Sequence, residues 1–252
     1  MTLNTIVFDL GGTLIEYAGE YDSWPDLETP GFRAAYAFLQ QEMELPPFAR
    51  FRDTGFSLLP LLWRQAQRTT ANFRVVDLLT ATLNAVGAGS PNGLVDEAAA
   101  QYTAAIQAQA WLIPDARETL AAVKEAGFKI GLVSNTMFPG KAHQEDLIRF
   151  GLADFFDTML FSADENKWKP TPDPFLHVLE ALQERGETAV YIGDDPASDV
   201  VGAQSAGMRA IYYRSSNRFA LPADVKPDAA VTALPELPDL LQSWRDAHGT
   251  AG

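Results

Sequence analysis

Acidic side chains follow two apolar runs that are short enough to be buried strands. Asp9 comes directly after Thr5–Phe8, and Asp194 comes just after Ala189–Ile192, with Asp199 about one helical turn further on. In an open parallel sheet, ligands bind beyond the carboxyl ends of the strands. Mg²⁺ takes oxygen ligands, usually one or two carboxylates together with waters and substrate oxygens. The spacing therefore indicates a site for a hard cation at one edge of a sheet.

A serine and a lysine occur in the same kind of place. Ser134 and Asn135 end the mostly apolar run Phe128–Val133, and Lys169 lies in KWKPTPDPF, just before a helix that begins at proline. Carboxylates alone would repel a phosphoryl group, whereas a metal ion and a lysine neutralise that repulsion. Carboxylates, a serine and a lysine on one rim therefore suit the handling of phosphate with a hard cation.

The elements that must position these residues alternate along the chain. β-branched and apolar runs predict strands at Thr5–Phe8, Phe128–Val133, Thr158–Phe161, Ala189–Ile192 and Ala210–Tyr213. Between them, proline starts and glycine stops predict helices at Pro114–Ala126, Lys141–Phe150, Pro172–Arg185 and Pro196–Ala206. This order predicts an α/β protein with a doubly wound parallel sheet and helices on both faces.

One long stretch, from about Tyr17 to Leu112, shows only helical patterns. Apolar residues recur at helical spacing from Val75 to Val86 and from Leu94 to Ile106, and Leu58 to Trp63 suggests another helix. The expected division is a core domain of residues 1–16 and 113–252 and an all-helical domain of residues 17–112. The tail should cover the core with a proline-rich stretch before a last helix near Leu240–Ala247.

Composition excludes several classes of partner. The 252 residues have a formal net charge of −14, which disfavours nucleic acid and anionic membranes, and contain no cysteine for disulfides or thiolate metal sites. No run approaches the roughly 18 apolar residues of a membrane span, and Asp9 interrupts the first apolar run, so no signal peptide is expected. The expectation is a cytoplasmic protein that acts on a small molecule.

Four motifs in order carry a family resemblance. FDLGGTL, LVSNT, KPTPDPF and GDDPASD together are similar to the motifs of the haloacid dehalogenase-like hydrolases, over Leu3–Ile15 and Trp111–Tyr213. The resemblance implies a Rossmann-like core, with the helical insert as a cap placed after the first motif. Most members are phosphatases, so it also implies a small phosphorylated substrate and Mg²⁺.

The resemblance also implies roles for individual residues. Asp9 would be the nucleophile that forms an aspartyl-phosphate, and Ser134, Asn135 and Lys169 would hold the phosphoryl group. The metal ligands would be Asp9, the backbone carbonyl of Gly11, Asp194 and Asp199, with Asp195 as an alternative supporting residue. The catalytic residues would then be Asp9, Ser134 and Lys169.

The first motif departs from the family pattern. Phosphatases of this family usually carry a second aspartate two residues after the nucleophile, as general acid and base, and this chain has Gly11 there. A general acid–base typically contributes about 10²–10⁴-fold, so slow hydrolysis is one expectation. A replacement by Glu16, Tyr17, a cap residue or the substrate itself is the other.

Other interpretations stay open. A 2-haloacid dehalogenase would use the same aspartate on carbon without metal, although Gly193-Asp194 favours phosphate, and a catalytically weak binding protein is a third reading. A sugar kinase of the actin-like class shares the glycine turn, but it needs a second glycine-rich loop and a longer chain. His143, His177 and His248 are expected at the surface, because nothing pairs them at metal-ligand spacing.

Overall fold

A six-stranded parallel sheet forms the centre of the computed structural model, which describes residues 2–21, 24–69, 73–214 and 219–249. The strands lie in the order β5-β4-β1-β6-β7-β8. Their bounds are β1 Thr5–Phe8, β4 Lys129–Ser134, β5 Thr158–Phe161, β6 Ala189–Gly193, β7 Arg209–Tyr213 and β8 Ala229–Val231. Chain order runs outward from β1 in both directions, so β1 lies at the switch point of the sheet, where open α/β folds bind ligands.

Alternation along β1 divides its side chains between two apolar cores. Ile6 and Phe8 are fully buried on one face, and Val7 is fully buried on the other. Because side chains of a strand alternate with period two, a strand that is apolar at every position must be covered on both faces. β1 is therefore a central strand, and its short length brings Asp9 to the carboxyl edge at once.

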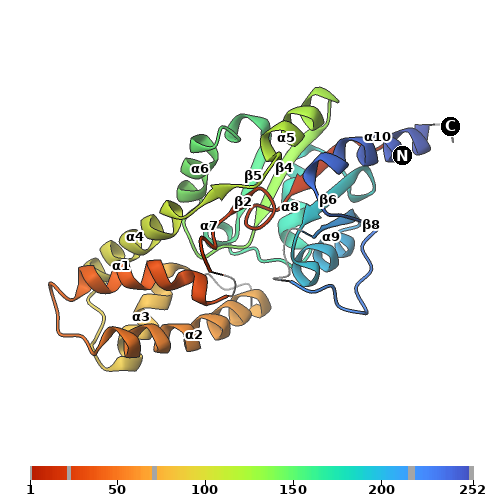
Figure 1. Cartoon of the computed structure of the whole chain (residues 1–252). Helices are drawn as coiled ribbons and strands as arrows, with labels where there is room; N and C mark the ends of the chain where they lie inside the picture. Colours follow the sequence, from red (N-terminus) through yellow and green to blue (C-terminus); the bar gives the residue numbers. More distant parts are fainter. Residues whose placement is uncertain (1, 22–23, 70–72, 215–218, 250–252) are drawn as a thin grey trace.

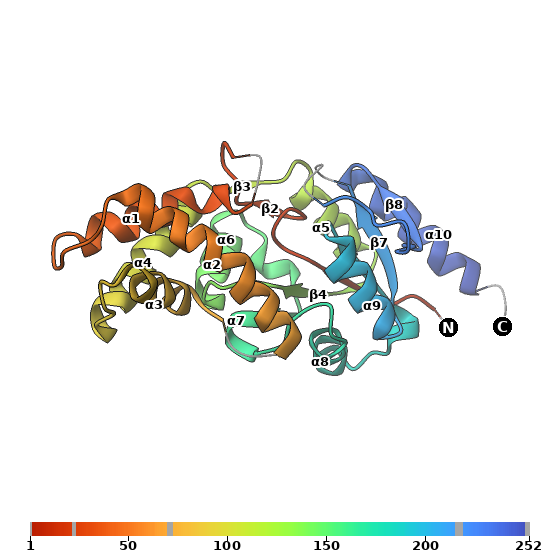
Figure 2. The ribbon, with the colours of Figure 1, turned by 90° about the horizontal axis from the view of Figure 1, so that it is seen from below.

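Helices cover both faces of the sheet, as the predicted fold class requires (Figures 1 and 2). The first face packs on side chains of α5, α6 and α10, and the second on side chains of α8, the π-helical turn η4 and α9. The bounds are α5 Ala116–Glu125, α6 Gly140–Arg149, α8 Asp173–Leu182, η4 Pro196–Val200, α9 Val201–Ser205 and α10 Leu237–Gly249. The short helix α7 spans Ser162–Glu165, and 3₁₀ turns η2, η3 and η5 span Ala153–Phe155, Gly186–Thr188 and Leu234–Glu236.

The insert forms a helical lobe to one side of the sheet (Figure 1). It consists of the 3₁₀ turn η1 Asp26–Glu28 and helices α1 Thr29–Leu39, α2 Phe48–Thr69, α3 Val75–Val86 and α4 Asn92–Ala108. A separate apolar core holds these helices together, and Met137 and Trp168 from the sheet side complete it. The lobe therefore has its own hydrophobic core and is also packed against the rest of the chain.

The expectation of helices alone between residues 17 and 112 is wrong at its C-terminal end, where β3 Trp111–Leu112 lies, and β2 Ile15–Glu16 just before the insert was not predicted either. The chain leaves the core through β2 and returns through β3, and the two pair antiparallel. Two residues are too few to show a period-two pattern in the sequence, so these strands follow only from the pairing.

Several predicted boundaries are also wrong. α8 ends at Leu182 rather than near Arg185, because Gln183 adopts the left-handed conformation (φ 57°) that was expected of Gly186. The predicted helix Pro196–Ala206 begins as the π-helical turn η4, and the last helix begins at Leu237 instead of Leu240. The prediction also omits α1 and, within the proline-rich tail, β8.

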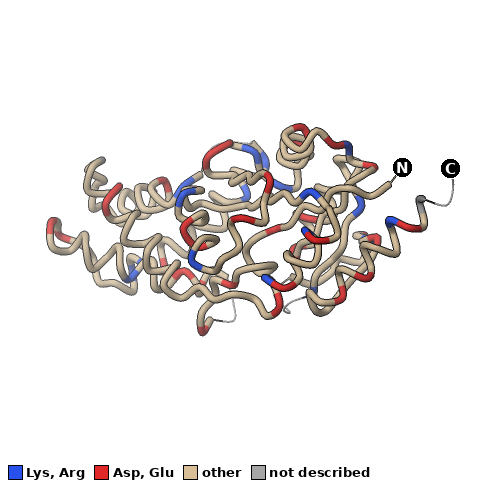
Figure 3. The backbone as a smooth tube through the Cα atoms, turned by 90° about the horizontal axis from the view of Figure 1, so that it is seen from above, with Lys and Arg blue, Asp and Glu red and all other residues tan. Residues whose placement is uncertain are grey.

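Charge is distributed over the surface with an acidic excess (Figure 3), as the 33 acidic and 19 basic residues require. In the part of the chain that the structure describes, every helix is too short or too polar to traverse a bilayer.

Close packing in the lobe gives a test of its core. Gly55 lies mid-way along α2, and a Cβ added there would be 2.2 Å from Cε1 of Phe32, a fully buried ring. Gly55→Ala should lower the free energy of unfolding by about 1–2 kcal/mol, since overpacking costs about 1–3 kcal/mol and the gain in helix propensity returns at most about 1 kcal/mol. Gly93→Ala in α4, where a Cβ would meet nothing within 4 Å, is the matched control and should not destabilise. Equal denaturant midpoints for Gly55→Ala and wild type would contradict this packing.

Candidate active site

Asp9 is held at the carboxyl end of β1 by neighbours on both sides. Its backbone N–H donates to the carbonyl of Ile192 (2.9 Å), which continues the pairing of β1 with β6 by one residue. The Thr13 hydroxyl donates to Oδ2 of Asp9 (3.2 Å), and only 6% of Asp9 is exposed. The carboxylate is therefore largely buried and is held in a fixed position.

A tight turn follows Asp9 and brings backbone atoms to the site. The carbonyl of Leu10 accepts hydrogen bonds from the N–H groups of Leu14 (2.9 Å) and Ile15 (3.0 Å), and Gly12 takes a φ of 80° that favours glycine. Gly11 lines the cavity beside Asp9, and a Cβ added there would meet only Cδ2 of Tyr17, at 3.8 Å. A Cβ atom therefore fits at Gly11 without a clash.

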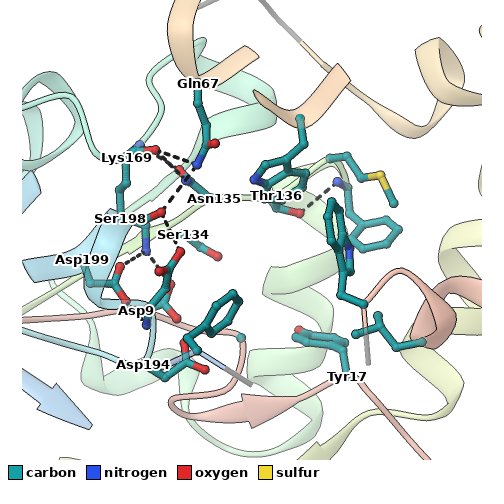
Figure 4. Close-up of a pocket in the computed structure, with 18 of the residues that line it drawn as sticks. Asp9, Tyr17, Gln67, Ser134, Asn135, Thr136, Lys169, Asp194, Ser198 and Asp199 are labelled. Atoms are coloured by element: carbon teal, nitrogen blue, oxygen red, sulfur yellow. Dashed lines mark hydrogen bonds and ion pairs between the residues drawn. The ribbon is translucent and has the colours of Figure 1, made fainter. Parts of the chain in front are cut away.

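Lys169 joins two of the carboxylates across a sequence separation of 160 residues. Its Nζ donates to Oδ1 of Asp9 and to Oδ1 of Asp199, both at 2.7 Å (Figure 4). It also donates to the hydroxyl of Tyr191 at 2.8 Å. Burial alone would lower the pKa of Lys169, but the carboxylates of Asp199 and Asp9 raise its pKa above the usual value. The lysine is therefore a permanent cation in this site.

Asn135 fixes the backbone from which Lys169 projects. The Lys169 N–H donates to Oδ1 of Asn135 and the Asn135 amide donates to the Lys169 carbonyl, both at 2.9 Å. Ser134, the last residue of β4, is 4% exposed and lines the same cavity. Two neighbouring residues at the end of β4 thus have different roles: Ser134 lines the cavity, and the side chain of Asn135, the residue after the strand, orients Lys169.

Three carboxylates form a cluster with the geometry of a cation site. Asp9, Asp194 and Asp199 are all buried, and one oxygen of each lies within 4.8 Å of the others. Against three carboxylates, Lys169 supplies one positive charge, so the fully ionised cluster has an excess of two negative charges. Buried oxygen ligands with this excess fit a divalent hard cation such as Mg²⁺.

Asp199 and Asp195 have different roles within the turn after β6. Burial raises the pKa of Asp199, Lys169 opposes this effect, and the charges of Asp9 and Asp195 add to it. Asp195 instead accepts hydrogen bonds from the Ala197 N–H (3.1 Å) and the Ser198 hydroxyl (2.7 Å), as the N-cap of η4. Of the two candidates for a supporting ligand, Asp199 is therefore the one that belongs to the carboxylate cluster.

All seven residues expected at the site line a single cavity of about 460 Å³: Asp9, Gly11, Ser134, Asn135, Lys169, Asp194 and Asp199. The lobe forms the opposite wall, with Trp24, Leu27, Glu28, Trp63, Gln67 and Ile106. Gln67 at the end of α2 donates to the Lys169 carbonyl (3.3 Å), and the Trp63 ring lies 5.2 Å from that of Trp168. The insert therefore lies over the carboxylate edge of the sheet.

The expectation that His143 lies at the surface is wrong. His143 is 4% exposed, lines the cavity and stacks on Phe161 with ring centroids 5.3 Å apart. Burial lowers its pKa to about 4, so the ring is neutral. His177 is exposed, as expected, and the side chain of His248 lies outside the described residues.

Sequence reasoning also missed the network around His143. Tyr17 Oη lies 3.0 Å from His143 Nδ1 and donates to Asp146 Oδ2 (3.2 Å), and Thr136 Oγ1 lies 2.7 Å from His143 Nε2. Because the Tyr17 hydroxyl donates its hydrogen bond to Asp146, a neutral His143 donates a hydrogen bond from Nδ1 to the Tyr17 oxygen and accepts one at Nε2 from the Thr136 hydroxyl. The network connects Tyr17, at the start of the insert, to α6 and to the loop after β4, and no local sequence pattern links residues so far apart.

Glu28 is a second polar residue that the sequence did not single out. It lies in η1, is 5% exposed, lines the cavity and accepts a hydrogen bond from the Tyr102 hydroxyl at 2.9 Å. Burial raises its pKa to about 7, although the Tyr102 hydrogen bond opposes the shift. The lobe thus presents a buried acid to the cavity.

Comparisons with known proteins agree with this arrangement. The family model of the haloacid dehalogenase-like hydrolases matches residues 3–207. A ribulose-1,5-bisphosphate 5-phosphatase of Halopiger xanaduensis is 26% identical over 94% of this chain and 98% of its own length. A glyceraldehyde 3-phosphate phosphatase of Pyrococcus furiosus is 32% identical, over 52% of this chain and 54% of its own length. The crystal structure of a 2-haloacid dehalogenase from Pseudomonas syringae pv. Tomato superposes with a TM-score of 0.69, at 28% identity and with 96% and 99% of the two chains covered.

Proposed function

The chain belongs to the haloacid dehalogenase-like hydrolases, and we propose that it is a Mg²⁺-dependent phosphohydrolase that acts on a small phosphorylated metabolite through an aspartyl-phosphate on Asp9. One observation carries the proposal. The Asp9 carboxylate lies at the switch point of the sheet, 2.7 Å from Lys169 Nζ and within 4.8 Å of the carboxylates of Asp194 and Asp199. Full-length similarity to a phosphatase supports the same reaction class.

In this proposal Asp9 attacks the phosphorus atom with one carboxylate oxygen. The P–O bond to the organic group breaks, its alkoxide takes up a proton, and the phosphoryl group stays on Asp9 as an acyl phosphate. Water then attacks the phosphorus atom, releases phosphate and restores the carboxylate. Lys169 and Ser134 hold the phosphoryl oxygens, and Asn135 keeps Lys169 in place through its backbone.

Asp9, Asp194, Asp199 and the carbonyl of Gly11 would hold Mg²⁺. When bound, the ion neutralises the charge that develops on the phosphoryl oxygens. The buried carboxylates and their excess of negative charge fit this role. Without a cation they repel one another and an incoming phosphate, so phosphate binding should depend on the ion.

We also propose the domain division of residues 1–16 with 113–252 as the core and residues 17–112 as a cap. The separate apolar core of the lobe and the β2–β3 junction support it. The cap would exclude water from the phosphoryl group and contact the organic part of the substrate. The two linkers Tyr17–Asp22 and Trp111–Pro114 would be the hinges of the cap; Asp22 lies outside the described residues.

A screen of phosphorylated metabolites with and without Mg²⁺ tests the reaction class. Release of inorganic phosphate that requires Mg²⁺ is the expected result. Chelation by EDTA should abolish release, and added Mg²⁺ should restore it. Absence of phosphate release over the whole panel at saturating Mg²⁺ would refute the proposal.

The proposed reaction needs a proton donor for the leaving oxygen, and Gly11 cannot supply one. Glu16 accepts hydrogen bonds from the backbone N–H groups of Tyr17 and Ala18, both at 2.8 Å. Tyr17 Oη is hydrogen-bonded to His143 and Asp146. Burial raises the pKa of Tyr17 well above its usual value, which makes it a poor acid. Two sources of the proton therefore remain: the substrate itself and the cap residue Glu28, which lines the cavity and has a pKa raised to about 7 by burial.

Gly11→Asp should accelerate hydrolysis of an unactivated alkyl phosphate, because a carboxyl group placed there can protonate the leaving oxygen. General acid–base catalysis contributes about 10²–10⁴-fold, and an untuned carboxyl should give at most about 10²-fold. A Cβ at this position clashes with nothing, and Gly11 lines the cavity. Steady-state rates on an alkyl phosphate and on p-nitrophenyl phosphate measure the effect, which should be smaller for the latter because p-nitrophenolate needs little help to leave.

Gly11→Asn is the matched control, since it adds the same volume and cannot transfer a proton at this step. Rapid-quench measurement of the phosphoenzyme lifetime separates its formation from its breakdown. If Gly11→Asp and Gly11→Asn behave alike in both steps with Mg²⁺ binding intact, then another group already transfers the proton.

A 2-haloacid dehalogenase is the second candidate, favoured by the similarity to the Pseudomonas syringae enzyme. In that reaction the Asp9 carboxylate would attack the carbon that carries the halogen, and halide would leave. The carboxylates of Asp194 and Asp199 beside Asp9 argue against it, because they would repel a haloacid carboxylate. Halide release from 2-chloropropionate without Mg²⁺ would support this candidate, and Mg²⁺-dependent phosphate release would exclude it as the main activity.

A further inference from the structure

The cavity has a strongly one-sided charge. Among the described residues that line it, Lys169 is the only cation, because burial keeps His143 neutral. Six lining residues carry carboxyl groups: Asp9, Glu16, Glu28, Asp194, Asp195 and Asp199. Lys169 Nζ bonds to Asp9 and Asp199, so this positive charge belongs to the end where the phosphoryl group would bind.

The opposite end of the cavity is apolar and aromatic. Trp24 and Trp63 line it with ring centroids 6.0 Å apart, and Leu27 and Ile106 extend the surface. From the core side, Met137 and Phe138 complete this wall. Burial of an apolar substrate group against this wall contributes about 25 cal/mol of favourable binding free energy per Å² of apolar surface removed from water.

Glu28 lies within this apolar wall and adds to the electrostatic field. Its carboxyl group is buried and accepts a hydrogen bond from Tyr102. A second anionic group on a substrate would have to lose its hydration against indole rings and beside this acid. A buried charge without a counter-ion is costly, whereas a neutral group of the same shape avoids that cost.

We propose that the substrate is a phosphomonoester with a largely apolar organic group and no second anionic group. The proposal rests on the proposed phosphohydrolase function and defines its substrate class. It sets this chain apart from the relative named ribulose-1,5-bisphosphate 5-phosphatase, whose named substrate carries a second phosphate. Phosphorylated carboxylic acids and bisphosphates should be poor substrates.

Three aryl phosphates test the proposal with wild-type protein and Mg²⁺. Phenyl phosphate, 4-carbamoylphenyl phosphate and 4-carboxyphenyl phosphate have similar shapes, and the last two differ by one negative charge. The neutral carbamoyl compound should have a kcat/KM about 10- to 100-fold higher than the carboxylate, as expected for a charge near Glu28 at an effective dielectric constant of about 20. Phenyl phosphate should resemble the carbamoyl compound.

Glu28→Gln locates the origin of the discrimination. At a pH well above the Glu28 pKa of about 7, where this carboxyl group is ionised, removal of its negative charge should reduce the ratio of the two kcat/KM values at least about threefold. Glu42→Gln changes the net charge equally, but Glu42 is exposed and outside the cavity, so it should leave the ratio unchanged. The ratio compares two substrates on one protein, so a general loss of activity in a variant cancels.

The outcomes separate this inference from the proposed function. A higher kcat/KM for the carboxylate, with Mg²⁺-dependent phosphate release, would overturn the substrate class and leave the phosphohydrolase intact. No Mg²⁺-dependent phosphate release from any of the three compounds would overturn both proposals together.

Discussion

Replacement of Asp9 by asparagine is expected to abolish turnover, with a fall in kcat of at least about 10³-fold, in line with the loss of a nucleophile in other covalent hydrolases. The amide is a weak nucleophile, and it cannot form the acyl phosphate through which the proposed reaction proceeds. Acid-quench trapping of phosphoprotein should detect the intermediate in wild type and none in the variant. This readout distinguishes a missing nucleophile from a merely slower enzyme.

The fold of the Asp9→Asn variant should persist. Asp9 adds to the repulsion that raises the pKa of Asp199, while Lys169 keeps Asp199 as its partner at 2.7 Å. Loss of one attraction and one repulsion should leave the melting temperature close to that of wild type. Asp173→Asn, at the exposed N-terminus of α8, is the matched control and should keep full activity. Turnover near the wild-type rate, with the substitution verified by intact mass, would rule out covalent catalysis by Asp9.

The sheet edge was predictable because its residues obey local rules. Buried parallel strands are continuous apolar runs, and a parallel sheet brings the ends of such strands to one side. Asp9, Ser134 and Asp194 could therefore be placed together from their positions after Thr5–Phe8, Phe128–Val133 and Ala189–Ile192. The fold class is confirmed by the six parallel strands and by the similarity to a dehalogenase structure.

The interactions that orient the site could not be predicted in the same way. Lys169 bonds to Asp9 across 160 residues and to the Tyr191 hydroxyl, and Tyr191 reads in the sequence as one more apolar strand residue. Pairing at this range depends on how helices and strands pack, which periodicity does not encode. The buried position of His143 has the same origin, because its partners Tyr17 and Thr136 come from other elements.

The lobe shows a related limit. The missed helix α1 carries Gly31 near its start, and α2 contains Pro60, so local propensity argues against both. Packing outweighs propensity here: Phe32 of α1 is fully buried and contacts the rings of Phe51 and Tyr102. Glu28, the buried acid in the cavity wall, lies just before this helix and was overlooked together with it.

Asp194→Asn is expected to raise the Mg²⁺ concentration required for half-maximal activity at least about 100-fold. Loss of an outer-shell partner of a metal ligand costs about 10–100-fold in affinity, and a direct carboxylate ligand should cost no less. The substitution halves the excess charge of the cluster, from two negative charges to one, because Lys169 remains. A neutral amide oxygen is also a poorer ligand for a hard cation. Calorimetric titration with Mg²⁺ measures the affinity without reference to turnover.

Asp195→Asn provides the matched control, one residue away. Asp195 caps η4 through the Ala197 N–H and the Ser198 hydroxyl, and asparagine is as good an N-cap as aspartate. It lies outside the cluster of Asp9, Asp194 and Asp199, so its loss of charge should weaken Mg²⁺ binding by less than about tenfold, as expected of a screened neighbour at an effective dielectric constant of about 20. A large difference between the two variants would place the ion on the Asp194 side of the turn. Equal weakening in both would mean that the ion responds only to total charge, and that Asp194 is not a ligand.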